Sequence, residues 1–355
     1  MSGKPEPPRG GTLVIQTAFL GDVILTTGLL EFLAGRFGPV DVVTTSAAAA
    51  LLETHPAVRH TFGYAKRGAD GGAAGLIRLA RSLRAVRYDR AYLPHRSFRT
   101  AMLARLAGIP ERVGFAGGSG SWSYTRRIAR PAAGHEAGRI LALAEPPPGT
   151  RAAVSLGLIA EDWRQASDWL AARGISPGFV ALAPGSIWGT KRWPYYAELA
   201  AALEGPIVIL GGPEDRPLAE SVAAGRKSAH VAAGDLSLRV SAALLAQAGV
   251  LVTNDSAPLH LAAAVGTRVV AVFGPTVPAF GFGPRGDADR IVEHPSMPCR
   301  PCSSHGPMVC PLGHHLCMRE ISVGRVLEML SGKSLLGEDL APLPAPRSPL
   351  PNQGA

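Results

Sequence analysis

Long apolar runs are absent from this sequence of 355 residues. The apolar stretches at residues 259–265 and 269–273 are separated by Gly266 and Arg268, and each is far shorter than the ~20 residues that a membrane span requires. Residues 1–10 are rich in Pro and Gly and have no apolar segment behind their charges, so they do not look like a signal peptide. We therefore expect a cytoplasmic protein, and any contact with a membrane would be peripheral.

Aromatic side chains are scarce, and basic side chains outnumber acidic ones. Phe, Trp and Tyr make up 6% of the residues, and 36 Lys and Arg stand against 27 Asp and Glu, which gives a net charge of +9. That balance favours an anionic partner, such as a nucleic acid, an acidic membrane surface or a phosphorylated substrate. Nucleic acid ranks lowest, because the arginines are scattered and few aromatic residues accompany them.

The length of the chain allows two domains, at about 150 residues each. Hydrophobic residues make up 46% of the chain, and 42 Gly and 31 Pro indicate many turns, which is typical of a globular protein. A Glu-Pro-Pro-Pro-Gly segment at residues 145–149 interrupts the pattern. We expect a disordered tail at residues 1–10, an N-terminal domain at 11–150, a linker region at 151–178, a C-terminal domain at 179–335 and a second disordered tail at 341–355.

Short apolar strands alternate with helical stretches in both halves. In the first half we expect strands at residues 12–17, 41–45 and 90–94 and helices at 23–37, 47–53, 75–86 and 98–107. In the second half we expect strands at residues 179–183, 206–210, 250–253 and 268–273 and helices at 194–203, 215–224, 238–247 and 258–265. This alternation predicts two α/β halves in tandem, each with a parallel sheet covered by helices on both faces.

Ligands of open α/β sheets bind beyond the carboxyl ends of the strands, so the loops after the strands are the first candidates for a site. The first such loop holds Leu20-Gly21-Asp22, where Gly21 would permit a close backbone approach and Asp22 could act as a general base. The alternative is a helix cap, and spacing alone favours the cap. The loop lacks Gly-x-Gly-x-x-Gly, which argues against a dinucleotide-dependent dehydrogenase.

Two loops of the second half could face a nucleotide. Pro184-Gly185-Ser186 leads to Lys191-Arg192-Trp193-Pro194, where two cations precede a helix that we expect to begin at Pro194. This arrangement suits a pyrophosphate, and a solvated turn is an equal alternative. Glu214 and Asp215, in Gly211-Gly212-Pro213-Glu214-Asp215, could accept hydrogen bonds from ribose or sugar hydroxyls or could cap the next helix.

A third loop opens a helix with Asn254-Asp255-Ser256-Ala257-Pro258-Leu259-His260. Ser256 is the expected cap, and the amide groups and positive dipole end of this helix make an anion site that His260 could reach. A lone histidine at this place is more commonly a packed residue. Together with Lys191, the phosphate interpretation becomes the favoured one.

Taken in order, these segments resemble glycosyltransferase family 9, the lipopolysaccharide heptosyltransferases, and most closely the heptosyltransferase II branch. The resemblance runs from Thr12 to about Leu330. Its most specific pieces are Gly21-Asp22, Pro184-Gly185-Ser186 with Lys191-Arg192-Trp193-Pro194, the segment from Asn254 to His260, and Phe273-Gly274-Pro275-Thr276. It implies the GT-B fold, an α/β architecture of two doubly wound, Rossmann-like domains that face each other across a cleft.

The resemblance also implies an inverting, metal-independent transfer of heptose from ADP-heptose to the inner core of lipopolysaccharide. It assigns Asp22 and Lys191 to catalysis, Gly21, Ser186, Glu214, Asp255, Ser256, Ala257 and His260 to the donor, and His95, Arg96 and Arg99 to the acceptor. Asp22 would be the base, which reverses the preference for a cap. A surface arginine pair is the alternative for Arg96 and Arg99.

All four cysteines lie in one short segment beside three histidines, as Cys299, Cys302, Cys310, Cys317, His305, His314 and His315. Cys-x-x-Cys with two further thiols could form a structural zinc or iron–sulfur site, although the second pair lacks the usual spacing. Disulfides are less expected in a reducing cytoplasm. The transfer itself is expected to require no cofactor.

The same architecture is compatible with other functions, since fold alone does not decide function. They are a family 9 transferase that uses another nucleotide sugar, a nucleotide-sugar epimerase and a non-catalytic nucleotide-sugar-binding protein. The expected partners are ADP-heptose, the lipopolysaccharide acceptor and the inner face of the inner membrane, where arginines would meet acidic lipids in a peripheral contact.

Overall fold

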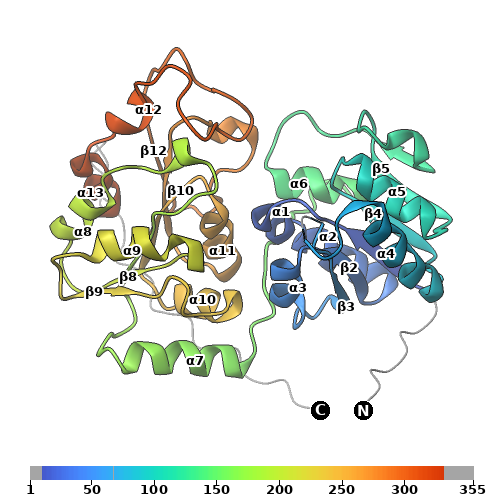
Figure 1. Ribbon diagram of the computed structural model, residues 1–355, viewed down its shortest axis with the longest axis horizontal. Coiled ribbons are helices and arrows are strands. Elements are labelled where there is room, and N and C mark those ends of the chain that lie inside the picture. The colour runs from blue at the N-terminus through green and yellow to red at the C-terminus, as the bar shows by residue number, and fades with distance from the viewer. Residues whose placement is uncertain (1–9, 67, 332–355) are drawn as a thin grey trace. The chain divides into compact units, whose positions relative to one another are not determined.

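The computed structural model describes residues 10–66 and 68–331, and the chain divides into two compact units, Met1–Gly157 and Leu158–Ala355. Figure 1 shows strands and helices alternating in each unit. Apart from Gly10, the tails expected at residues 1–10 and 341–355 lie outside the described residues. Within the described part, no helix has the length and apolar composition that a bilayer span would need.

The first unit contains a six-stranded sheet in the order β3-β2-β1-β4-β5-β6, and every neighbouring pair is parallel. Its strands are β1 (Thr12–Ile15), β2 (Val40–Thr44), β3 (Val58–Gly63), β4 (Arg90–Leu93), β5 (Glu111–Phe115) and β6 (Arg126–Ile128). Its helices are α1 (Leu20–Leu25), α2 (Thr27–Phe37), α3 (Ser46–Leu52), α4 (Gly72–Val86), α5 (Phe98–Leu106), η1 (Ser121–Ser123), α6 (Glu136–Leu141) and η2 (Ala142–Ala144). The strand order reverses between β1 and β4, which is where ligands of such sheets bind.

The second unit repeats this topology with the sheet order β12-β11-β10-β7-β8-β9. Its strands are β7 (Val180–Ala183), β8 (Ile207–Ile209), β9 (Ala229–Val231), β10 (Val250–Asn254), β11 (Val269–Phe273) and β12 (Arg290–Glu293). Its helices are α7 (Ala160–Ala171), η3 (Gly189–Lys191), α8 (Tyr196–Ala202), η4 (Pro213–Asp215), α9 (Arg216–Ala223), α10 (Leu238–Leu245), α11 (Ala257–Val265), η5 (Pro278–Phe280), α12 (Leu316–Arg319) and α13 (Val323–Ser331). The expected α/β class with doubly wound parallel sheets is confirmed, and the reversal here lies between β7 and β10.

Several boundaries differ from the sequence expectations for identifiable reasons. The expected helix at residues 23–37 begins earlier, as α1, and breaks at Thr26, whose hydroxyl donates to the Asp22 carbonyl at 2.7 Å. Residues 160–171 of the expected linker form α7. The helix expected to begin at Pro194 begins at Tyr196. Strands β3, β5, β6, β9 and β12 were not expected, because they are short or carry polar residues.

The central strands are buried on both faces, which explains their continuous apolar sequences. Leu13 and Ile15 in β1 and Leu251 and Val252 in β10 are fully buried. In the first unit, one core cluster joins β1 and β4 to the inner sides of α4 and α5. The outer sides of α4 and α5 are therefore left to face solvent.

One carboxylate is buried inside the first sheet and is fully bonded. Asp41 in β2 is 0% exposed and accepts hydrogen bonds from Arg59 Nε at 2.9 Å, Arg59 Nη2 at 2.8 Å and the Tyr88 hydroxyl at 2.5 Å. Burial, followed by the charge of Asp41, raises the pKa of Tyr88, so this hydroxyl stays protonated and donates. The cluster ties β2 to β3 and to the segment that precedes β4.

We expect Asp41→Ala to lower the free energy of unfolding of the first unit by about 3 kcal/mol, because Arg59 and Tyr88 would lose their shared buried acceptor. Glu53→Ala is the matched control, since Glu53 is exposed and should change stability by no more than about 0.5 kcal/mol. Urea unfolding followed by circular dichroism measures both. Equal unfolding midpoints for the two variants would contradict this account of Asp41.

Candidate functional site

Three loops meet around one buried ion pair at the carboxyl edge of the second sheet. Lys191 Nζ donates to Asp255 Oδ2 at 2.6 Å, and the Thr276 hydroxyl donates to the same oxygen at 2.6 Å. Lys191 is 8% exposed, Asp255 7% and Thr276 1%. The loops follow β7, β10 and β11, which are neighbours in the sheet, so their carboxyl ends lie together. The structure thus brings together Lys191 and Asp255, two residues that the sequence motifs place in the candidate site.

Asn254, at the end of β10, fixes the positions of these loops. Its Nδ2 donates to the Pro184 carbonyl at 2.8 Å, and its Oδ1 accepts from the Trp193 amide and the Tyr196 hydroxyl, both at 3.2 Å. Burial raises the pKa of Tyr196, which keeps that hydroxyl a donor. Asn254 is fully buried and ties β10 to both ends of the loop that carries Lys191. The sequence segment was singled out, but Asn254 itself received no role.

Helix α11 begins beside the ion pair. Ser256 occupies its N-cap position, yet the Ser256 side chain makes no cap hydrogen bond and donates instead to the Asn254 carbonyl at 3.4 Å. Ser256 is therefore the N-cap residue, as expected, but its hydroxyl does not bond to the amides of the first turn. His260, the fourth residue of α11, is buried, and its ring centroid lies 6.2 Å from that of Phe282.

In the acidic loop after β8, Asp215 is the residue that packs against the Gly185 turn. Asp215 Oδ2 accepts the Gly212 amide at 3.0 Å, and a Cβ built on Gly185 would lie 2.3 Å from Asp215 Oδ1. Gly185 must therefore remain without a side chain for this contact to form. Glu214 is exposed and folds back over Gly212. Capping was one of the two uses expected of Asp215, and its carboxylate does accept a capping amide.

Ser186 is buried between the Gly185 turn and η3. Its hydroxyl accepts the Trp188 amide at 3.3 Å, and its carbonyl accepts Arg192 Nε at 2.9 Å. Arg192 is thereby used to brace the loop, while Lys191 points to Asp255. The two adjacent cations consequently have different surroundings.

The segment at residues 299–317 packs against the Lys191 and Thr276 loops. The Pro307 carbonyl accepts from the Thr190 amide at 3.3 Å and from the Thr190 hydroxyl at 2.5 Å. His315 Nε2 lies 2.7 Å from the Thr190 carbonyl, and since a carbonyl can only accept, this ring nitrogen is the protonated one. Arg300 donates to the Thr276 carbonyl at 2.8 Å. The Cys-rich segment thus supports the ion pair from both sides.

The four cysteines are free thiols. Cys299, Cys302 and Cys310 line a hollow of about 240 Å³ together with Pro301, Pro311 and Leu312. Burial raises the pKa of Cys317 to about 11, which keeps that thiol protonated. In the described ranges, no group of three or more His, Cys, Asp or Glu side chains is arranged to hold a metal ion. The possible zinc or iron–sulfur site is thus not preformed there.

In the first unit, Asp22 lies in the first turn of α1, after β1. Its Oδ2 accepts the Phe19 amide at 3.2 Å, so the capping use considered from the sequence is present. The side chain is only partly buried, whereas Gly21 beside it is buried. A cap fixes the direction of a carboxylate without excluding a second use for it.

The acceptor-side candidates follow β4, the neighbour of β1. His95 Nδ1 lies 3.3 Å from the Thr17 hydroxyl, and Lys66 Nζ donates to the Thr17 carbonyl at 2.5 Å. Burial, assisted by the charge of Lys66, lowers the pKa of His95 to about 4. His95 is therefore a neutral imidazole at physiological pH. Thr17 and Lys66 were not singled out, because neither lies in a recognisable motif.

The two arginines near His95 have different surroundings. Arg99 Nε donates to the Tyr64 hydroxyl at 2.6 Å and Arg99 Nη2 donates to the Gly72 carbonyl at 2.6 Å, so this side chain is a structural tie. Arg96 is exposed and makes one bond to the Gly117 carbonyl at 3.1 Å. Of the two, Arg96 is better placed to meet a dissolved anion.

Sequence comparisons with known proteins show the family of this chain. The sequence profile of Glycosyltransferase family 9 (heptosyltransferase) matches residues 76–311. Lipopolysaccharide heptosyltransferase 2 of Salmonella typhimurium is 29% identical over 299 residues, which cover 76% of this chain and 84% of that protein. Lipooligosaccharide heptosyltransferase 2 of Haemophilus influenzae is 25% identical over 349 residues, which cover 90% of this chain and 98% of that protein.

Solved structures show the same fold. ADP-heptose lipopolysaccharide heptosyltransferase II of E. coli matches with a TM-score of 0.74 and 26% identity and covers 91% of this chain and 98% of its own. A glycosyl transferase family 9 protein from Veillonella parvula matches with a TM-score of 0.80 at 23% identity and covers 93% of this chain and 98% of its own. The expected GT-B fold is confirmed.

We predict that the free energy of unfolding decreases as the pH falls from 6.5 towards about 4 and that part of this decrease comes from His95. Unfolded His95 takes up a proton in this window, whereas folded His95, with its lowered pKa, does not. His95→Gln removes the titrating group and keeps a hydrogen-bonding side chain, so it should lose less stability between pH 7 and pH 4.5. Urea unfolding at both pH values tests this. The same loss in both proteins would contradict the lowered pKa and neutral state of the partly buried His95.

Proposed function

Because the chain belongs to glycosyltransferase family 9, we propose that this glycosyltransferase moves heptose from ADP-heptose to the inner core of lipopolysaccharide with inversion at the anomeric carbon. The observation that carries the proposal is the Lys191–Asp255–Thr276 cluster at the start of α11. A fixed cation next to the positive end of a helix suits a diphosphate. The E. coli relative is described as acting with ADP-heptose.

On the donor side, Lys191 and the amides of Ser256 and Ala257 would hold the diphosphate. An ammonium group has three donors, so Lys191 can bind a phosphate oxygen and keep its bond to Asp255. Asp255 would then act by orienting Lys191 as well as by contacting the donor sugar.

Four further residues complete the proposed donor site. His260 would bind donor sugar or phosphate, and Ser186 would line the diphosphate side. Glu214, exposed in η4, would accept from the nucleoside, and Gly21 would allow the donor to approach the backbone.

On the acceptor side, Asp22 would act as the general base. It would take the proton of the acceptor hydroxyl while that oxygen attacks the anomeric carbon and the bond from that carbon to the β-phosphate oxygen breaks. ADP would leave with the electron pair, and Lys191 and the α11 N-terminus would meet the developing charge. No metal or cofactor enters this step. His95, Arg96 and Arg99 would lie on the acceptor side, where Arg96 could meet an acceptor phosphate.

Lipopolysaccharide is a glycolipid, so the proposed acceptor also implies that the protein works beside a membrane. We expect the protein to work in the cytoplasm, at the inner face of the inner membrane, through a peripheral contact. The wider proposal of another nucleotide sugar as donor uses the same diphosphate contacts and differs only at the sugar.

Asp22→Asn separates the two uses of Asp22. Asn can still accept the Phe19 amide through its side-chain oxygen, so the cap and the stability should persist, while the base is lost. We expect product formation from ADP-heptose and a truncated lipopolysaccharide acceptor to fall by about 10²- to 10⁴-fold. A variant as active as the wild type, with an equal unfolding midpoint, would leave Asp22 as a cap only. Donor turnover without acceptor would indicate an epimerase instead.

A thermal-shift series tests the donor contacts separately from transfer. ADP at ~100 times its dissociation constant should stabilise the wild type by about 2.7 kcal/mol, with UDP and GDP stabilising less at equal concentration. Lys191→Met should abolish the ADP effect. Glu214→Asn is the matched control. It alters only the nucleoside end of the proposed site, so it should weaken the stabilisation by ADP without abolishing it. ADP stabilisation that survives in Lys191→Met would remove Lys191 from the diphosphate site.

A further inference from the structure

We propose that the outer face of α4, α5 and η1 docks on an anionic lipid bilayer. We call this surface the arginine face and define it by Ile77, Arg81, Phe98, Arg105, Leu106 and Trp122. The inference rests on the proposed function only for the identity of the membrane, because the lipid contact follows from the face itself.

Positive charge gathers in the part of the chain that forms this face. Residues 71–135 contain twelve arginines, and their only acidic residues are Asp89 and Glu111. In the described part of the chain, Arg81 and Arg105 form no ion pair with an acidic side chain. The neighbouring Arg78 differs, since its Nη2 donates to Asp70 Oδ1 at 2.6 Å. Among the described residues, no acidic side chain neutralises these two cations.

Large apolar side chains are exposed among these cations. Trp122 is 55% exposed, Phe98 52%, and Ile77 and Leu106 43% each. Single exposed apolar residues are ordinary, but four of them on adjoining elements are not. An exposed cluster of this kind favours a partner that can take up apolar surface.

The elements that carry these residues adjoin one another. Helices α4 and α5 pack side by side on one face of the first sheet (Figure 1), and Arg99 of α5 donates to the Gly72 carbonyl at the start of α4. At the other end, Arg84 Nε lies 3.7 Å from the Cβ that Gly108 would carry. The two helices are therefore in contact along their lengths.

Trp122 joins the face through η1. A Cβ on Gly120 would lie 2.3 Å from the Ala101 Cβ and 3.3 Å from the Phe98 Cα, so the start of η1 packs directly on α5. The Arg105 guanidinium lies 5.5 Å from the centroid of the Trp122 ring. The indole is thus held beside a cation on the same surface.

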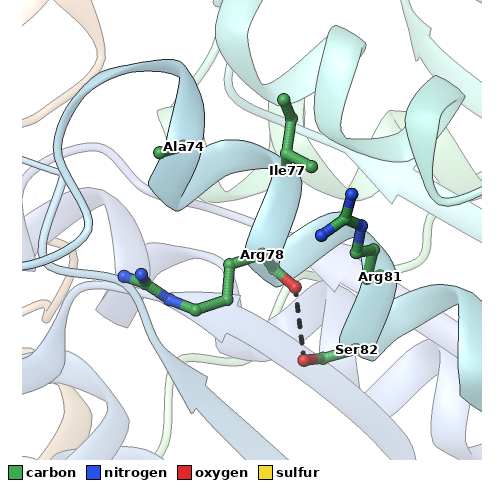
Figure 2. A pocket seen from close by; sticks show the side chains of 5 residues that line it. All are labelled: Ala74, Ile77, Arg78, Arg81 and Ser82. Atoms are coloured by element: carbon green, nitrogen blue, oxygen red, sulfur yellow. Dashed lines mark hydrogen bonds between the residues drawn. The ribbon is translucent and has the colours of Figure 1, made fainter.

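Figure 2 shows the α4 part of the arginine face. The side chains that line a shallow hollow here are Ala74, Ile77, Arg78, Arg81 and Ser82, and the Arg78 side chain extends away from that of Arg81. An exposed aliphatic side chain beside arginines on one helix provides both the apolar and the basic groups that helices at a membrane interface use.

The chemistry of the face favours lipid over nucleic acid. Ile77 and Leu106 have no ring that could stack on a base, whereas both can enter the acyl boundary of a bilayer. Trp122 combines an apolar ring with a donor and suits the headgroup level. Arginines meet lipid phosphates with paired donors. A bilayer can satisfy all of these side chains together.

Co-flotation of the full-length protein with vesicles tests the proposal. One set of vesicles contains phosphatidylglycerol mixed with phosphatidylcholine, and the other contains phosphatidylcholine alone. The wild type should float with the anionic set and much less with the neutral set, and high salt should release it. Equal flotation with both sets would overturn the proposal.

Variants locate the contact. Arg81→Gln with Arg105→Gln should lower partitioning about 25-fold, since each arginine near an anionic surface contributes about a fivefold factor. Arg36→Gln with Arg319→Gln removes the same charge from exposed positions elsewhere and should change partitioning only a few-fold. Trp122→Ser with Phe98→Ser should also weaken binding while net charge is unchanged. Equal partitioning of the two arginine pairs would overturn the arginine face as the contact.

The outcomes separate this inference from the proposed function. Both arginine pairs should transfer heptose to a truncated, lipid-free acceptor at the wild-type rate. If the wild type transfers heptose but does not float with anionic vesicles, only the lipid contact is contradicted. If it floats but does not transfer heptose, only the proposed reaction is contradicted. A third outcome would favour nucleic acid as the partner: the wild type does not float but binds single-stranded RNA, and Arg81→Gln with Arg105→Gln abolishes that RNA binding.

Discussion

The buried ion pair between Lys191 and Asp255 is the constraint around which the second unit's site is built. A charge is taken out of water at a high cost unless a partner and further hydrogen bonds compensate for it. Here Asp255 compensates Lys191, and Thr276 gives the same carboxylate oxygen a second donor. The loops after β7, β10 and β11 must therefore hold fixed positions so that these buried polar groups keep their hydrogen-bond partners. A site held in this way is already organised before an anion arrives, which lowers the cost of binding.

The Cys-rich segment at residues 299–317 has a structural role in this arrangement. Through Pro307 and His315 it holds Thr190, the residue before the lysine, and through Arg300 it holds the carbonyl of Thr276. The segment therefore supports the ion pair at both of its ends. The free thiols lie within a segment whose backbone and side chains position charged groups in the neighbouring loops.

Much of the fold could be predicted from the sequence, because the central strands are continuous apolar runs. Edge strands such as β6 and β9 have three residues each and mixed polarity, so periodicity does not reveal them. The loops after β1, β7 and β10 could be identified because function concentrates at the carboxyl ends of strands. The roles of Thr276 and His315 could not, since the bond from His315 joins residues 125 positions apart. Ser256 shows a further limit, because a residue at an N-cap position can use its hydroxyl elsewhere.

The central claim is that Lys191, kept in place by Asp255, grips a diphosphate at the start of α11. A crystal structure of the complex with ADP measures this most directly. The account predicts a phosphate oxygen about 3 Å from Lys191 Nζ, with a second one near the amide of Ser256 or Ala257, and with Asp255 still bonded to the lysine. The claim would be contradicted if the phosphates bound at another edge of this unit, or if Lys191 made no contact with them.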